Sequence, residues 1–217
     1  MNSERLEEKW QIHVNNKKND MHLHFDMLKS ISMDSNIVVE LGIREVVSTW
    51  ALMAGLANRP ERFITVNPER NKLVEHGFHF LKSYDIVHPA EYGIDIEEIK
   101  DIARENGVEW EFFHIDTLKT EIPLCDTIFF DTDHTYEQLS QELKLHAGKA
   151  GKFLAFHDTS RYGGELIPAI NEFLEENTEW HILHCENLCQ GLTVLIKASL
   201  GDMEKAGIQK HDRLPNE

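Results

Sequence analysis

Near the middle of the chain stands the sequence TIFFDTDH, residues 127–134. A short run that favours a strand is followed at once by two acids and a histidine, as expected for a buried strand that ends at a polar sheet edge. Four other short runs have the same character: IVVEL at 37–41, FITV at 63–66, WEFF at 110–113 and FLAF at 153–156. We interpret all five as strands.

Segments with a helical spacing of apolar residues separate these runs. One apolar stripe covers residues 96–103 and stops before Gly107, and another covers 136–147 and stops before Gly148. Alternation of strands and helices predicts βαβ units and a parallel sheet.

The end of the chain breaks this alternation. The apolar runs 180–183 and 192–196 are separated by a short connection containing Gly191, in which no helix fits. We expect the two runs to pair as an antiparallel hairpin. The predicted architecture is an α/β fold with a mostly parallel seven-stranded sheet, helices on both faces and this hairpin at the end.

Three regions are expected along the chain. Residues 1–34 form a helical cap or lid outside the sheet, 35–200 form the α/β domain, and 201–217 form a frayed polar tail. Within the domain, a helix that includes His79 is expected after the second run, and 83–95 is expected to be a long loop that shapes the pocket.

Composition limits the classes of partner. The 217 residues include 38 acidic and 22 basic residues, so the net charge is -16. Such a chain repels phosphate backbones, which disfavours nucleic acid as a partner, and no apolar run is long enough to span a membrane. Three cysteines are too few for a disulfide framework and indicate a reducing, cytoplasmic setting.

Candidate functional residues follow the predicted strands. Ligands of open parallel sheets bind beyond the carboxyl ends of the strands, so these residues are expected to converge. They are Glu40, Gly42, Asn67, Asp116, Asp131, Asp133, His134, His157 and Asp158. The alternative is that each acid only begins a loop and caps the next helix.

Two parts of the chain resemble a known family. The sequence ELGIR at 40–44, followed by Ser48 and Thr49, resembles the first motif of class I S-adenosylmethionine-dependent methyltransferases. The sequences FDTDHTY at 130–136 and FHDT at 156–159 resemble the small-molecule and sugar O-methyltransferase branch grouped with cephalosporin-hydroxylase-like proteins. The similarity covers residues 36–197 and implies a Rossmann-like methyltransferase fold.

The resemblance implies a site for S-adenosylmethionine. Glu40 and Gly42 would border the methionine end of this cofactor. Asn67 would meet the ribose hydroxyls, and Asp116 would lie near the adenine. The full set of implied cofactor-binding residues is Glu40, Gly42, Arg44, Ser48, Asn67, Asp116 and Asp131.

The resemblance also implies a metal site and a base. Asp131, His157 and Asp158 would hold Mg²⁺ or another divalent cation, and His134 would be the general base. Methyl transfer to oxygen requires an aligned and deprotonated hydroxyl, and a cation held by carboxylates lowers the pKa of such a hydroxyl. The predicted activity is methyl transfer from S-adenosylmethionine to a hydroxyl of a small molecule or sugar.

Two departures from the family pattern motivate other hypotheses. The family has a further glycine where this chain has Glu45, Val46 and Val47, and an acid where it has Asn67. A β-branched residue resists positive φ, and an amide accepts hydrogen bonds less well than a carboxylate. One alternative is therefore a binding or accessory protein with a degenerate donor site, and another is a metal-dependent hydrolase. The N-terminal helices could also support a homo-oligomer.

Overall fold

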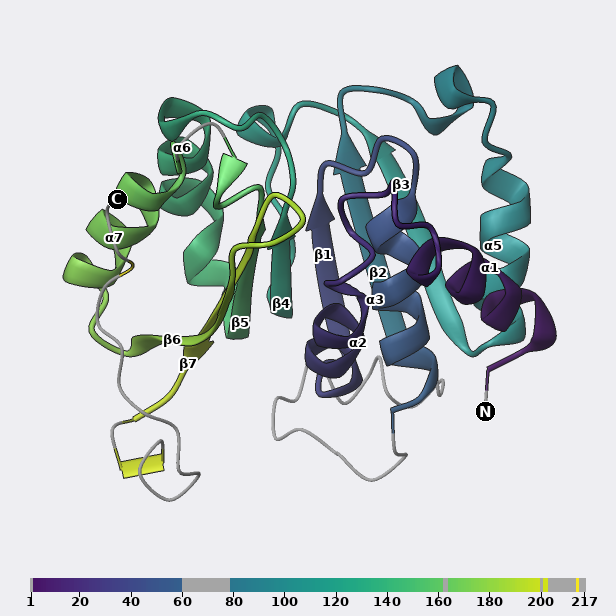
Figure 1. Cartoon of the computed structure of the whole chain (residues 1–217), viewed down its shortest axis with the longest axis horizontal. Coiled ribbons are helices and arrows are strands. Elements are labelled where there is room, and N and C mark those ends of the chain that lie inside the picture. The colour runs from purple at the N-terminus through teal and green to yellow at the C-terminus, as the bar shows by residue number, and fades with distance from the viewer. Residues whose placement is uncertain (1, 60–78, 162–163, 200, 203–213, 215–217) are drawn as a thin grey trace.

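The computed structural model describes residues 2–59, 79–161, 164–199, 201–202 and 214 (Figure 1). Seven strands form one sheet in the order β3-β2-β1-β4-β5-β7-β6. They are β1 (Ile37–Leu41), β2 (His79–Asp85), β3 (Val108–His114), β4 (Cys125–Phe130), β5 (Ala150–His157), β6 (Trp180–Glu186) and β7 (Leu192–Lys197). The first five strands are parallel to one another, whereas β7 is antiparallel to both β5 and β6. The mostly parallel sheet with a final antiparallel hairpin is confirmed.

Six α-helices accompany the described strands. They are α1 (Glu4–Val14), α2 (Phe25–Met33), α3 (Val47–Ala57), α5 (Ile96–Glu105), α6 (Tyr136–His146) and α7 (Ile167–Glu176). Short 3₁₀ turns occupy Pro89–Tyr92, Thr117–Lys119 and Ala147–Lys149. Side chains satisfy free amides at several helix starts: Asp95 accepts from the Glu97 amide before α5, and Thr135 accepts from the Gln138 amide before α6.

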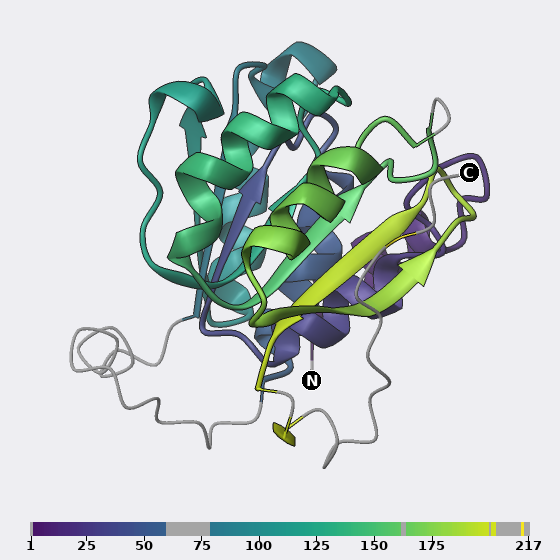
Figure 2. The same ribbon diagram turned by 90° about the vertical axis from the view of Figure 1, so that its left-hand side faces the viewer.

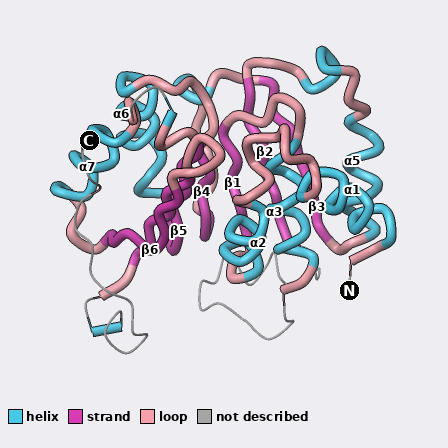
Figure 3. The backbone as a smooth tube through the Cα atoms, in the orientation of Figure 1, coloured by secondary structure: helices cyan, strands magenta, loops and turns pink. Residues whose placement is uncertain are grey.

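Helices cover both faces of the sheet, as predicted (Figures 2 and 3). One buried cluster joins α1, α2, α3 and α5 to the sheet, and a second joins α6 and α7 to it. Strand β1 shows why two layers form: Val38 belongs to the first cluster, whereas Val39 and Leu41 belong to the second. Successive side chains of a strand point to opposite faces, so an apolar strand needs cover on both sides.

The neighbour of β1 is not the segment expected from the sequence. The run 63–66 lies outside the described residues, and the strand beside β1 is β2, which includes His79. The prediction of a helix through His79 was wrong, and the loop predicted from 83 begins only after Asp85. Ile86, Val87 and Tyr92 of this stretch line the cavities, as predicted. In β2 the buried Leu81 and Ser83 alternate with half-buried Lys82, which pairs with Glu111 on β3. That cross-strand pair accommodates a lysine in a central strand.

The N-terminal helices belong to the core of the domain. Leu6 and Trp10 from α1 and Phe25 and Leu28 from α2 are buried in the same cluster as α3. The segment between the two helices reaches the carboxyl edge of the sheet, where it lines a cavity.

Leu214 corrects the expectation of a frayed tail at one position. It is buried, its amide donates to Asn171 Oδ1 at 2.8 Å, and its carbonyl accepts from Asn171 Nδ2 at 3.2 Å. An apolar side chain in a polar tail gains by packing against α7. Among the described residues, no helix is both long and apolar enough to cross a membrane.

Candidate functional site

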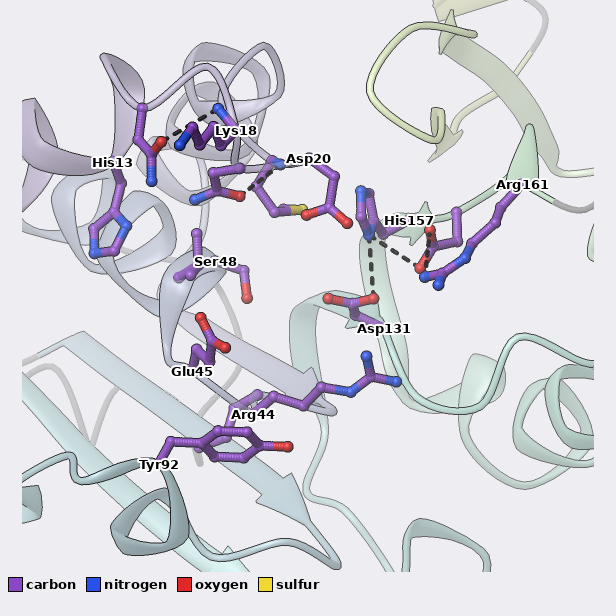
Figure 4. Close-up of a pocket in the computed structure, with 16 residues that line it drawn as sticks. His13, Lys18, Asp20, Arg44, Glu45, Ser48, Tyr92, Asp131, His157 and Arg161 are labelled. Atoms are coloured by element: carbon purple, nitrogen blue, oxygen red, sulfur yellow. Dashed lines mark hydrogen bonds and ion pairs between the residues drawn. The ribbon is translucent and has the colours of Figure 1, made fainter.

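Two cavities open at the carboxyl edge of the sheet. The larger, about 430 Å³, is lined by the segment between α1 and α2, by the turn after β1, and by residues at the ends of β4 and β5 (Figure 4). The smaller, about 350 Å³, is lined by Gly42, 85–87, 116–118 and 131–133. Arg44 and Asp131 line both cavities. The two spaces therefore adjoin at these residues.

A compact group of acids and imidazoles, the ion cluster, consists of Asp131, His134, His157 and Asp158. His134 Nε2 lies 2.6 Å from Asp158 Oδ2 and 3.7 Å from Asp131 Oδ1. His157 Nδ1 lies 3.2 Å from Asp131 Oδ1 and 3.3 Å from Asp158 Oδ2. Arg161 adds a contact of 3.3 Å to Asp158 Oδ1. The predicted catalytic and metal residues thus meet at adjacent ends of β4 and β5.

The carboxylates of the ion cluster hold protons on both imidazoles. Asp131 and Asp158 raise the pKa of His134 to about 9. Burial disfavours the charged form of His157, but the same two carboxylates outweigh it and raise its pKa to about 11. Burial would raise the pKa of Asp158, yet His134 and His157 hold it well below the usual range. Two acids are therefore balanced by two imidazolium groups.

The turn between β6 and β7 orients His157. His157 Nε2 lies 3.3 Å from the Cys189 carbonyl, and His24 Nε2 from the N-terminal region lies 3.0 Å from the same oxygen. With the carbonyl at Nε2, Nδ1 of His157 is directed at the carboxylates. The Ser160 amide also donates to the Gln190 carbonyl at 2.8 Å, which ties the turn to the end of β5.

Gly42 is required by its neighbour in the fold. Its φ is +83°, and a Cβ there would lie 2.1 Å from the Asp131 carbonyl oxygen. No other residue lets the turn after β1 pass so close to the end of β4. Gly42 also lines the smaller cavity, as its predicted role requires.

The expected resistance of Val46 to positive φ does not prevent that conformation. Arg44 has φ 37° and Val46 has φ 62°, although neither is glycine. Left-handed non-glycine residues cost about 1–3 kcal/mol each and persist where the surroundings compensate. Val46 is buried in the first core cluster, and Asp85 Oδ2 accepts from the amides of Ile43 at 2.7 Å and Arg44 at 3.1 Å.

Asp85 is a site residue that the sequence analysis missed. It ends β2, lines the smaller cavity, and accepts from the Val87 amide through Oδ1 at 2.8 Å. The position predicted for this strand end, Asn67, lies outside the described residues. The alternation of Leu81 and Ser83 with Lys82 was the signal that could have located Asp85.

Glu40 is placed away from both cavities. Its carboxylate is fully buried and accepts from the hydroxyls of Ser48 at 2.6 Å, Thr49 at 2.9 Å and Ser83 at 2.7 Å. Burial raises the pKa of Glu40 to about 7, although these hydroxyls act against the shift. Glu40 thus joins β1 to β2 and to the start of α3, and Ser48 also lines the larger cavity.

Asp116 lines the smaller cavity, and its place near an adenine stays a prediction. Its carboxylate accepts from the Leu118 amide at 2.9 Å and contacts Lys119 at 2.8 Å. The contacts with Leu118 and Lys119 show that capping and cavity lining can coexist in one acid.

Glu142 is a second residue that the sequence analysis missed. It is buried on α6 and accepts from Thr117 at 2.6 Å, Thr132 at 2.8 Å and Gln138 at 2.9 Å. All three donors line the smaller cavity. Its position three residues after Leu139, on the same apolar face of α6, was the available signal.

The donor set of the ion cluster suits a divalent cation. Ligand atoms of Asp131, His134 and Asp158 lie within 4.8 Å of one another, and so do those of Asp20, His157 and Asp158. Carboxylate oxygens are the preferred ligands of Mg²⁺ and Ca²⁺, and imidazole nitrogen suits Mn²⁺ and other transition ions. The two carboxylates therefore fit such an ion, and an imidazole can join them as a ligand once it has lost its second proton.

Comparison with known proteins identifies the fold. No protein-family model matches the sequence. An alignment over 120 residues, which covers 51% of this chain, is 31% identical to the diaminopimelate decarboxylase of Buchnera aphidicola subsp. Baizongia pistaciae (strain Bp). The match spans about a quarter (26%) of that protein.

Solved methyltransferases match over most of the chain. The SAH-bound (S-adenosylhomocysteine-bound) Podospora anserina methyltransferase PaMTH1 is 14% identical, with a TM-score of 0.54. The match covers 90% of this chain and 88% of that chain. The O-methyltransferase from Bacillus cereus in complex with SAH is 12% identical, with a TM-score of 0.54. The match covers 91% of this chain and 92% of that chain. At these identities the likeness establishes the fold alone, which is the Rossmann-like fold of these solved methyltransferases.

Proposed function

We propose that this protein is an S-adenosylmethionine-dependent O-methyltransferase that acts on a hydroxyl of a small molecule or sugar. The observation that carries the proposal is the pair of adjoining cavities at the carboxyl edge of the sheet, with the ion cluster at their junction. One cavity would hold the donor and the other the acceptor. Because Arg44 and Asp131 line both, a methyl group would pass from one to the other at this point.

The smaller cavity is suited to the nucleoside end of the donor. It lies at the ends of β1 to β4 and is lined by Asp116 and by residues 85–87. The methionine end would then lie toward Arg44, whose guanidinium has no carboxylate partner among the described residues. An arginine at this junction can pair with the carboxylate of the donor.

His134 is the proposed general base. It sits between the two carboxylates of the ion cluster, both of which line the acceptor cavity. Asp131 and Asp158 raise the pKa of His134 to about 9, so the ring carries two protons at neutral pH. It must lose one of them before it can accept a proton from the acceptor hydroxyl. Buried Asp158 stabilises the imidazolium that forms and holds the ring in place.

We propose that a divalent cation assists the methyl transfer. Asp131 and Asp158 would hold it, with the imidazoles alongside, and when bound it would lower the pKa of the acceptor hydroxyl. Calcium, magnesium and manganese are all compatible with these ligands.

Donor binding tests the function most directly. We expect calorimetric titration with S-adenosylhomocysteine to give saturable one-site binding, and Asp116→Asn to weaken it. A folded protein that does not bind this ligand at millimolar concentration would contradict the proposal. Screening hydroxylated small molecules and sugars for methyl transfer from S-adenosylmethionine would then identify the acceptor, and hydrolysis without donor binding would favour the hydrolase alternative.

A further inference from the structure

The segment between α1 and α2, residues 15–24, forms a wall of the larger cavity (Figure 4). It is remote in sequence from β4 and β5, and the proposed reaction assigns no role to it. Within this wall Asp20 lies beside His157 in Figure 4. One ligand atom each from Asp20, His157 and Asp158 lies within 4.8 Å of the other two.

Residues on both sides of Asp20 are anchored. Met21 is buried in the first core cluster, and its amide donates to Asn19 Oδ1 at 2.8 Å. Further along, His24 is buried and lies 3.0 Å from the Cys189 carbonyl, the same oxygen that faces His157. The backbone at Asp20 is therefore placed by contacts that do not involve its own side chain.

The carboxylate of Asp20 is uncommitted. Within the described part of the chain it takes part in no hydrogen bond or ion pair, whereas its neighbours Asn19 and His22 are hydrogen-bonded to each other at 2.7 Å. Asp158, in contrast, contacts His134, His157 and Arg161. An exposed acid held beside a buried acid in a cavity is stabilised when a cation lies between them.

We propose that Asp20 is a ligand of the divalent cation at Asp158, so that the cation joins residues 15–24 to the carboxyl edge of the sheet. This inference rests on the cation site of the proposed function. A spacing of up to 4.8 Å between ligand atoms suits positions on opposite sides of a cation with bonds of about 2.3–2.6 Å. With the shorter bonds of about 2.0–2.1 Å that Mg²⁺ demands, the segment would move slightly inward.

The test measures Mn²⁺ binding to the full chain without donor or acceptor. Free Mn²⁺ is followed by electron paramagnetic resonance for wild type, Asp20→Asn, Asp20→Glu and a control, Asp26→Asn. Asp26 is an exposed acid in the first turn of α2, on the same N-terminal region but outside both cavities. Hydrogen exchange of residues 15–24, with and without Mn²⁺, provides a second readout.

We expect Asp20→Asn to bind Mn²⁺ at least about tenfold more weakly, since even partners outside the first coordination sphere contribute 10–100-fold. Asp20→Glu should recover part of this loss, and Asp26→Asn should match wild type. Mn²⁺ should slow exchange of 15–24 in wild type but not in Asp20→Asn.

Equal Mn²⁺ affinity and equal protection in wild type and Asp20→Asn would overturn the inference, as would a wild-type chain that binds no Mn²⁺. Binding of S-adenosylhomocysteine reports on the proposed function separately. If that ligand binds while Asp20→Asn leaves Mn²⁺ binding unchanged, only the role of Asp20 is removed.

Discussion

The acidic residues in the two halves of the carboxyl edge have different hydrogen-bond and ion-pair partners. On the side of β1 to β3, Glu40 and Asp85 accept hydrogen bonds from hydroxyls and backbone amides. On the side of β4 and β5, Asp131 and Asp158 face imidazoles that carry protons. The first arrangement holds the backbone in shape, whereas the second has groups that exchange protons. Under the proposed function, the first half would shape the donor site and the second would transfer the proton.

Replacing Asp158 should have the largest effect, because it should impair methyl transfer at β4 and β5 while leaving donor binding at β1 to β3 intact. Asp158→Asn keeps a residue that tolerates the φ of 58° but leaves the half-buried Asp131 as the one carboxylate of the ion cluster beside His134 and His157. We expect unfolding free energy to fall by about 3–5 kcal/mol and methyl transfer to fall at least about a hundredfold, while the folded variant still binds S-adenosylhomocysteine. Wild-type turnover in this variant would contradict a catalytic ion cluster. Asp101→Asn, an exposed change on α5, serves as the control.

Gly42 tests the junction between the halves. A Cβ in Gly42→Ala would meet the Asp131 carbonyl at 2.1 Å, so we expect the free energy of unfolding to fall by about 3 kcal/mol. Gly107→Ala is matched, since its φ is +69° and a Cβ there meets nothing within 4 Å. It should lose only about 1 kcal/mol, which measures the backbone effect alone. Equal losses in chemical denaturation would show that the close approach to β4 is unimportant.

The buried Glu40 should make the free energy of unfolding depend on pH. Its folded pKa of about 7 lies above its ordinary value of 4.5. The folded state then binds more protons than the unfolded state between these values, so stability falls as pH rises from 4.5 through 7. At about 1.4 kcal/mol per pKa unit the whole difference corresponds to about 3.5 kcal/mol, of which about 2–3 kcal/mol is lost between pH 4.5 and 7. Denaturation from pH 4.5 to 8 should show this decline in wild type and in the exposed control Glu137→Gln but not in Glu40→Gln; parallel curves for all three would refute it.

Asp85 should give the smallest effect, confined to the donor side. Asp85→Asn retains one acceptor oxygen but can no longer receive all three amides, from Ile43, Arg44 and Val87. A lost hydrogen bond to a charged group corresponds to about tenfold weaker binding of S-adenosylhomocysteine, measured by calorimetry. The maximal rate at saturating donor should be close to wild type. A fall in that rate with unchanged affinity would place Asp85 with the catalytic half instead.

Much of the fold follows from local patterns. Strand runs with polar residues at their ends, helical stripes closed by glycine, and a helix-free connection before the hairpin are all short-range signals. They locate β1, β3, β4 and β5, and they bring Asp131 and Asp158 to one edge because parallel strands end together. Strand β2 was not predicted, since the lysine within it is accommodated by a partner on β3 that no local pattern reveals.

The one-dimensional pattern could therefore determine that acids and histidines meet at a sheet edge, because spacing along strands and helices sets the direction of each side chain. Orientation within that edge required the three-dimensional fold. Glu40 turns toward α3 and Ser83 instead of a cavity, and Val46 takes a left-handed conformation held by packing and by the hydrogen bonds of Asp85. Asp20 reaches Asp158 only because α1 and α2 pack on the sheet, and such long-range packing energy is absent from any local stretch of sequence.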